Sequence, residues 1–158
     1  MVQGDAGRCA ARAHAFGRLP AAHQVLAGAG GAANAIAFAL AEAGATQLAV
    51  YNRSADKVRA MFARLGPVYP QVELVLGSRD PQGYDLIVNA TSLGMASADP
   101  LPLDAHLLKA EQTVAEIIMA PVLTPLLAAA KAKGCRIQYG APMLASQIEL
   151  MADFMGAK

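Results

Sequence analysis

Glycines at positions 28, 30 and 31 stand between a short apolar run and an alanine-rich segment, a spacing typical of a dinucleotide-binding turn. In such a turn Gly28 permits a tight change of direction and Gly30 lets the backbone approach a pyrophosphate, while Ala33 keeps the next helix close to the sheet. The N-terminus of that helix offers unpaired N–H groups and a positive dipole end to the phosphates. Plain strand-to-helix corners share this spacing and are the alternative. The expected phosphate-binding residues are Gly28, Gly30, Gly31 and Ala32.

The segment after the second apolar run, Tyr51-Asn52-Arg53-Ser54, indicates which dinucleotide fits. A site for NAD usually places Asp or Glu there, roughly 20 residues after the glycines, to bind the ribose 2′-hydroxyl. Here no carboxylate ends the run, and the Arg53 guanidinium can pair with a 2′-phosphate through two hydrogen bonds. Ser54 adds a hydroxyl, and Lys57 adds a positive charge one helical turn later. We therefore predict NADP rather than NAD; the alternative is that Arg53 and Lys57 form a solvated face and that Ser54 only caps a helix.

One further segment and three single residues carry interpretations drawn from residue type alone. Asn89-Ala-Thr-Ser92 is a polar exit from an apolar run, so it is either a ribose contact or a simple turn. Glu116 lies in a run that reads as a buried strand, and we expect a paired structural carboxylate there rather than a catalytic one. Met95 and Met143 are expected to fill the core.

Alternating strands and helices must position these residues. We expect strands at 25–27, 47–51, 72–76, 86–88, 114–118 and 136–139, and helices at 32–43, from the cap Ser54 to 65, from the cap Thr124 to 133, and at 142–155. Six short strands with intervening helices predict an α/β fold, a doubly wound parallel sheet of the Rossmann type. Ligands bind such sheets at the carboxyl ends of the strands, where positions 28, 52, 89 and 140 all fall.

Composition limits the class of protein. The 158 residues fit one domain, expected at 23–158, with residues 1–22 as a peripheral helical segment. A net charge of +1 gives no reason to expect nucleic acid or a membrane surface as a partner. Cys9 and Cys135 lack the spacing of a zinc site or a disulfide framework, so we expect no metal. No apolar run reaches membrane length and no signal peptide is evident, which favours a cytoplasmic protein.

Five motifs occur in order between about residues 24 and 155. They are Gly28-Ala-Gly-Gly-Ala-Ala33, Asn52-Arg-Ser54, Asn89-Ala-Thr-Ser-Leu-Gly-Met95, Thr124-Pro-Leu-Leu127 and Gly140-x-x-Met143-Leu144-x-x-Gln147. Together they resemble the NADP-binding, C-terminal half of the shikimate dehydrogenase and quinate/shikimate dehydrogenase-like family. The resemblance implies an adenosine 2′-phosphate site at Asn52, Arg53, Ser54 and Lys57; ribose and nicotinamide contacts at Asn89, Thr91 and Ser92; a nicotinamide flanked by Gly140 and Met143; and a substrate contact at Gln147.

The chain departs from the family pattern where catalysis is concerned. The family's Lys and Asp, which act as acid and base, come from a preceding substrate domain, whereas only about 23 residues precede the first strand here. No residue matches that Lys, and Asp5 is either a remnant of the Asp or an exposed N-terminal side chain. Met119 stands where the family has a substrate-facing Tyr, which leaves the true substrate open.

The sequence thus predicts the NADP-binding domain of an oxidoreductase that transfers hydride between NADP(H) and a shikimate-type ring acid, a step of aromatic amino acid biosynthesis. A missing substrate domain or a partner chain must supply the acid–base groups, so we expect no turnover from this chain alone and an exposed apolar patch near the cleft. A free-standing NADP-binding module without turnover is the alternative. A methyltransferase is disfavoured because Asn52-Arg53 replaces the acid expected after the second strand.

Overall fold

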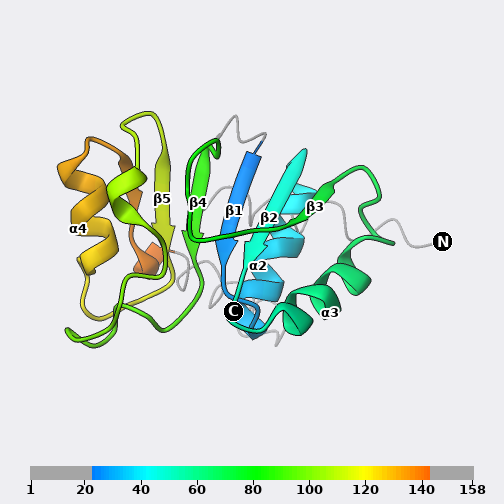
Figure 1. The fold of residues 1–158 in the computed structure, drawn as a ribbon, viewed down its shortest axis with the longest axis horizontal. Helices are drawn as coiled ribbons and strands as arrows, with labels where there is room; N and C mark the ends of the chain where they lie inside the picture. The colour runs from blue at the N-terminus through cyan, green and yellow to red at the C-terminus, as the bar shows by residue number, and fades with distance from the viewer. Residues whose placement is uncertain (1–22, 143–158) are drawn as a thin grey trace, which may run out of the picture.

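The computed structural model describes residues 23–142, which form one six-stranded sheet with helices packed against it (Figure 1). The strands are β1 (His23–Ala27), β2 (Gln47–Tyr51), β3 (Glu73–Leu76), β4 (Leu86–Asn89), β5 (Thr113–Glu116) and β6 (Arg136–Gln138). The helices are α2 (Gly31–Glu42), α3 (Ala55–Leu65) and α4 (Pro125–Ala132), with a short 3-10 helix η2 (Ala105–Leu107). The predicted positions of all six strands and of these three helices are confirmed to within two residues at each end.

Every neighbouring pair of strands is parallel, in the order β3-β2-β1-β4-β5-β6. The chain runs outward from β1 to β3 and then crosses back to β4 on the other side of β1. The strand order therefore reverses between β1 and β4, which is the place where ligands bind doubly wound sheets. The predicted fold class is confirmed.

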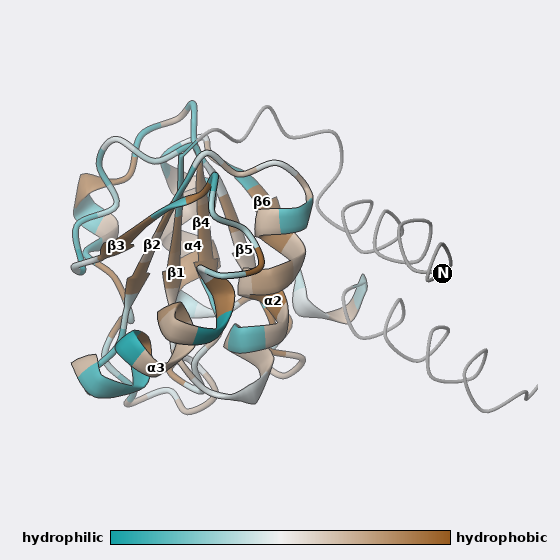
Figure 2. Cartoon of the chain, turned by 90° about the vertical axis from the view of Figure 1, so that its right-hand side faces the viewer, coloured by the Kyte–Doolittle hydropathy of each residue, from teal (hydrophilic) through white to brown (hydrophobic). Residues whose placement is uncertain are grey.

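Burial on both faces explains why the central strands are almost wholly apolar. Leu26 of β1 packs in one core cluster with α2 and α3, whereas Val25 and Ala27 on the opposite face pack in a second cluster with α4 and η2. Figure 2 shows the strands mainly in the brown of hydrophobic residues, with hydrophilic positions on the outer side of α3. The two clusters fix the sheet between the helices.

Small residues let α2 lie close to the sheet. Ala33, Ala37 and Ala41 are fully buried or nearly so, and Ile36 and Leu40 supply the apolar volume. This placement confirms the packing expected of Ala33. The helix begins one residue earlier than expected, at Gly31.

α4 begins with the predicted cap. Thr124 is buried, its hydroxyl accepts a hydrogen bond from the Leu127 N–H at 3.2 Å, and Pro125 occupies the first helical position. We expect Thr124→Ala to lower the free energy of unfolding by about 0.5–2 kcal/mol, because the Leu127 N–H loses its acceptor. Thr124→Ser, which keeps the hydroxyl, should recover most of the loss in urea unfolding. Equal midpoints for Thr124→Ala and the unsubstituted chain would contradict this role.

The expected cap of α3 is confirmed in position only. Ser54 occupies the N-cap position of α3, but its side chain makes no capping hydrogen bond. No helix joins β3 to β4: only residues 77–85 connect them, and Gly77, Pro81 and Gly83 interrupt that short segment. Tyr84 of this connection packs against the core cluster that also contains residues of η2 and α4.

Several expectations fall on residues outside the described part of the chain. These are the helical segment 1–22, the closing helix beyond residue 142, Asp5, Met143 and Gln147. Within residues 23–142, no helix combines the length and the apolar character needed to cross a membrane.

Candidate dinucleotide site

The turn after β1 requires a glycine. The Gly28 N–H donates to the Tyr51 carbonyl of β2 at 2.7 Å, and the Ala90 N–H after β4 donates to the Ala27 carbonyl at 2.8 Å. These bonds hold the ends of three adjacent strands together. Gly28 has φ +117°, and a Cβ there would lie only 2.8 Å from the Ala90 carbonyl oxygen. Gly28 therefore allows the tight turn that the sequence predicted, and it also allows the close approach of the Ala90 carbonyl.

Open space lies beyond Gly30 and Gly31. A Cβ at either position would meet no atom within 4 Å. Gly30 is the N-cap of α2, no side chain caps the helix, and no acidic residue occurs in its first turn. The Asn34 amide donates to the Gly30 carbonyl at 2.8 Å and so turns toward an acceptor rather than toward the exposed N–H groups. The N-terminus of α2 therefore presents N–H groups and a positive dipole end to a space that can receive an anion.

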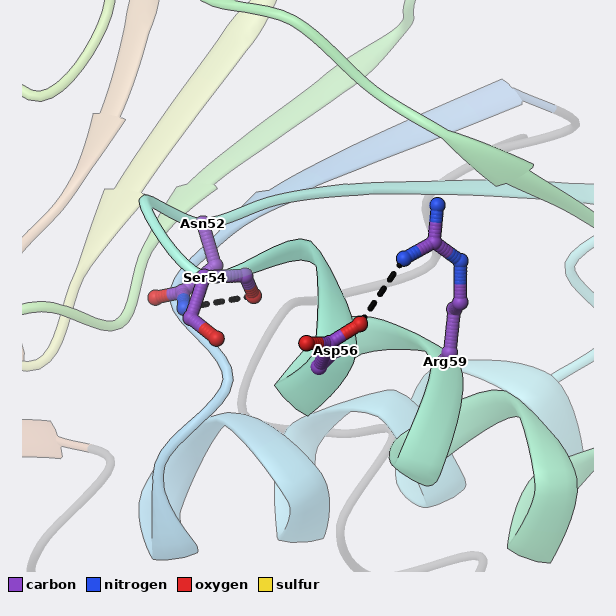
Figure 3. Close-up of polar contacts among 4 residues, drawn as sticks. All are labelled: Asn52, Ser54, Asp56 and Arg59. Atoms are coloured by element: carbon purple, nitrogen blue, oxygen red, sulfur yellow. Dashed lines mark hydrogen bonds and ion pairs between the residues drawn. The ribbon is translucent and has the colours of Figure 1, made fainter.

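The segment after β2 exposes a guanidinium that has no partner in the described part of the chain. Arg53 is exposed and makes no hydrogen bond or ion pair with any of residues 23–142. Asn52 shapes the segment, because its side-chain amide donates to the Ser54 carbonyl at 3.1 Å (Figure 3). The nearby carboxylate, Asp56, pairs instead with Arg59 at 2.9 Å and leaves Arg53 unpaired (Figure 3).

Ser54 and Lys57 lie in the first turn of α3 or directly before it. The Ser54 hydroxyl is not used as a cap, and the exposed Lys57 has no ionic partner among the described residues. Both residues lie within four positions of Arg53 in the chain, and neither side chain is engaged in a cap or an ion pair with the described residues.

The side chain of Asn89 bonds to the protein itself and is not left free to contact a ribose. It is fully buried at the end of β4, and its amide nitrogen donates to the Leu93 carbonyl and to Glu116 Oε1, each at 3.0 Å. Its oxygen accepts from the Thr91 N–H at 3.0 Å and from the Thr91 hydroxyl at 2.7 Å. The protein itself uses both ends of the amide. Asn89 therefore shapes the loop 89–93, and the exposed Ser92 is left on its surface.

Glu116 ends β5 directly opposite Asn89 in the strand register, and its side chain is fully buried. Burial raises the pKa of its carboxyl, and the side chains of Asn89 and Thr124 oppose that shift only in part. Oε2 has no hydrogen-bond partner among residues 23–142. The expected paired carboxylate is thus paired on one oxygen only, and with an amide rather than a cation.

Gly140 follows β6 and packs directly against the chain leaving β5. It is buried, and a Cβ there would overlap the Ile118 carbonyl oxygen and come within 2.7 Å of the Ile117 carbonyl carbon. The position needs a glycine because two backbone segments meet there. It brings residue 140 to the same edge of the sheet as Gly28 and Asn89.

Four large apolar side chains are exposed beside this edge. Gly94 of the β4 loop abuts Ile118 and Thr124 of the β5–α4 loop, which brings the neighbours of these residues together. The exposed fractions are 61% for Met95, 43% for Met119, 65% for Val122 and 44% for Leu123. We call these four residues the apolar rim. The core position expected for Met95 is therefore wrong, and the exposure of these four side chains agrees with the expected apolar patch.

Asp99 is a structural residue that the sequence analysis missed. Its carboxylate accepts the Gly94 N–H at 3.0 Å and the Ala96 N–H at 2.9 Å. These backbone hydrogen bonds lower the pKa of Asp99. An Asp before Pro100 in a stretch of small residues is the signal that could have identified this loop clasp.

The described residues thus form one edge with three parts. They are an anion cradle at Gly28–Gly31, exposed basic and hydroxyl groups at Arg53, Ser54 and Lys57, and an ordered loop at 89–93 beside Gly140. Residues 23–142 contain no group of three side chains able to hold a metal ion.

Comparisons with known proteins agree with this geometry. The family model for shikimate/quinate 5-dehydrogenase matches residues 10–97. The NADP(+)-dependent shikimate dehydrogenase of Rhodopseudomonas palustris (strain TIE-1) is 38% identical over 147 residues, which are 92% of this chain and 52% of that protein. This chain therefore spans about half the length of that relative.

Solved structures match over the same extent. Shikimate 5-dehydrogenase of Thermus thermophilus, in complex with NADP(H) and shikimate, matches at 33% identity with a TM-score of 0.73, covering 89% of this chain and 52% of that one. Quinate dehydrogenase of Corynebacterium glutamicum, in complex with NAD, matches at 26% identity with a TM-score of 0.79, covering 89% and 52%. The resemblance inferred from the five motifs is confirmed: the chain belongs to the shikimate/quinate 5-dehydrogenase family.

Proposed function

We propose that the carboxyl edge of the sheet binds NADP(H), with the adenosine 2′-phosphate at Arg53. The exposed guanidinium after β2, which has no partner within residues 23–142, is the observation that carries this proposal, because no carboxylate stands there to receive a ribose 2′-hydroxyl. A planar guanidinium matches a phosphate through two hydrogen bonds. Ser54 and Lys57 add a hydroxyl and a second charge. The absence of an acid at this place favours NADP over NAD.

The carboxyl edge of the sheet also suggests where the remaining parts of the dinucleotide bind. The pyrophosphate lies over Gly30 and Gly31 at the N-terminus of α2, where the backbone is open. Thr91 and Ser92 border the second ribose, and Gly140 borders the nicotinamide. Bound NADP(H) supplies or accepts the hydride at the nicotinamide, and the protein orients the ring.

We further propose that this domain serves hydride transfer to or from a shikimate-type ring acid, together with a domain or partner chain that holds the substrate. Two observations support this: the chain spans about half of its dehydrogenase relatives, and the apolar rim is exposed beside the proposed nicotinamide position. An exposed apolar group of this kind favours a further protein surface there over a free-standing binding module.

Substitution of Arg53 tests the cofactor assignment. Arg53→Ala should weaken NADPH binding by ~1.5–3 kcal/mol, or roughly 10- to 150-fold, because a charged hydrogen-bonded pair is lost. NADH binding should change little, since NADH carries no 2′-phosphate. Fluorescence titration with both reduced cofactors measures the two affinities.

Arg136→Ala is the matched control. Arg136 is exposed at the start of β6, so it lies at the amino ends of the strands, away from the proposed site at their carboxyl ends. It should leave both affinities unchanged. Equal losses of NADPH and NADH binding in Arg53→Ala would refute the 2′-phosphate assignment.

A further inference from the structure

The loop 89–93 is held by hydrogen bonds that converge on one buried amide. Asn89 accepts from the Thr91 N–H and donates to the Leu93 carbonyl, and the Thr91 hydroxyl accepts from the Leu93 N–H at 3.1 Å. The Asn89 amide has two protons. One goes to the Leu93 carbonyl, and the second goes to Glu116 Oε1 of the next strand.

A carboxyl group at Glu116 is costly for folding. Its side chain is fully buried, no cation among the described residues pairs with it, and burial raises its pKa. An apolar side chain of similar size would remove this desolvation cost, but it would also leave the second proton of the Asn89 amide without its acceptor. Polar contacts with Asn89 and Thr124 distinguish a carboxyl from an apolar group here, and the contact with Asn89 is the one that reaches the loop 89–93.

We propose that Glu116 is a positioning residue for the proposed dinucleotide site: its Oε1 satisfies the second proton of the Asn89 amide and thereby holds the loop 89–93 in the shape that borders the nicotinamide ribose. Glu116 itself touches neither the cofactor nor the substrate, because it is buried beneath the loop. This inference rests on the proposed NADP(H) site and adds a residue that acts only through Asn89.

Glu116→Met and Glu116→Gln separate this role from general stability. Met has a similar volume but no comparable acceptor, whereas Gln keeps an acceptor oxygen for Asn89. We expect Glu116→Met to fold, since the removed desolvation cost of the carboxyl offsets the lost hydrogen bond, and to bind NADPH roughly tenfold more weakly, because the loop 89–93 loses the acceptor that holds Asn89. Glu116→Gln should bind NADPH within about threefold of the unsubstituted chain, because its side-chain oxygen can still accept the second proton of the Asn89 amide.

Binding of 2′,5′-ADP supplies the spatial control. This fragment carries the adenosine and its 2′-phosphate but no nicotinamide ribose, so its affinity should be the same in all three proteins. Loss of 2′,5′-ADP binding equal to the loss of NADPH binding would overturn the proposal. NADPH affinity unchanged in Glu116→Met, or equally reduced in Glu116→Gln, would also overturn it.

Amide hydrogen exchange tests the same role without a ligand. In Glu116→Met the Thr91 and Leu93 N–H groups should exchange faster, while the Gly28 N–H, bound to the Tyr51 carbonyl, should keep its rate. If the unsubstituted chain bound neither ligand, the proposed NADP(H) function would fail, whereas the exchange rates would still decide whether Glu116 orders the loop. Unchanged exchange at Thr91 and Leu93 would contradict the inference.

Discussion

Gly28→Ala should destabilise the domain by roughly 2–6 kcal/mol. About 1–3 kcal/mol arises from a φ of +117°, which side chains other than glycine rarely adopt, and about 1–3 kcal/mol from overlap with the Ala90 carbonyl. That carbonyl belongs to the residue directly after β4, at the start of the loop 89–93, so it cannot move without disturbing both. The melting temperature should fall by roughly 2–4 °C for each kcal/mol in a chain of this size.

Substitutions at two other glycines separate the cost of the positive φ from the cost of overlap with the Ala90 carbonyl. Gly44 has φ +98° but open space around its Cβ direction, so Gly44→Ala measures conformational strain without overlap. Gly31 lies in α2 with open space and no positive φ, so Gly31→Ala should be neutral or stabilising by about 0.4–1 kcal/mol. Gly28→Ala no less stable than Gly44→Ala would show that the turn does not depend on close approach to β4.

Gly140→Ala should cost about 3 kcal/mol, the upper part of the range for overpacking, although its backbone is not strained. The added Cβ would overlap backbone atoms of Ile117 and Ile118, including a carbonyl carbon at 2.7 Å and a carbonyl oxygen at 2.8 Å from Ile117. Backbone atoms at the end of a strand cannot rotate away as a flexible side chain can. The chain after β6 must therefore separate from the chain after β5.

Urea unfolding measures this loss, and Ala141→Ser is a control for an exposed substitution at the next residue. Gly140→Ala should also weaken NADPH binding, because the proposed nicotinamide position lies beside Gly140. Stability within about 0.5 kcal/mol of the unsubstituted chain, the range of an ordinary surface substitution, would contradict the packing described for this position.

Sequence patterns predicted those parts of the structure that depend on residues close together in the chain. Short apolar runs placed every strand, and Thr124-Pro125 placed the start of α4 with its cap. Arg53 after β2 was identified because the last residue of a strand and the first residues after it lie at the sheet edge by construction of the fold. Local spacing is sufficient for these features.

Contacts between distant segments escaped prediction. Asn89 and Glu116 are 27 residues apart, so nothing in either motif indicates that the amide is used inside the protein. The steric need for Gly140 arises only where the chain after β6 meets the chain after β5. Met95 was placed in the core on residue type, but the positive φ of Gly94 and the clasp of Asp99 turn this loop outward, and Met95 is exposed.

A crystal structure of this chain grown with NADP+ would test the central claim most directly. The account predicts the 2′-phosphate within hydrogen-bond distance of the Arg53 guanidinium and the pyrophosphate over Gly30 and Gly31. A dinucleotide bound with its 2′-phosphate away from Arg53, or an edge left empty at saturating NADP+, would contradict it.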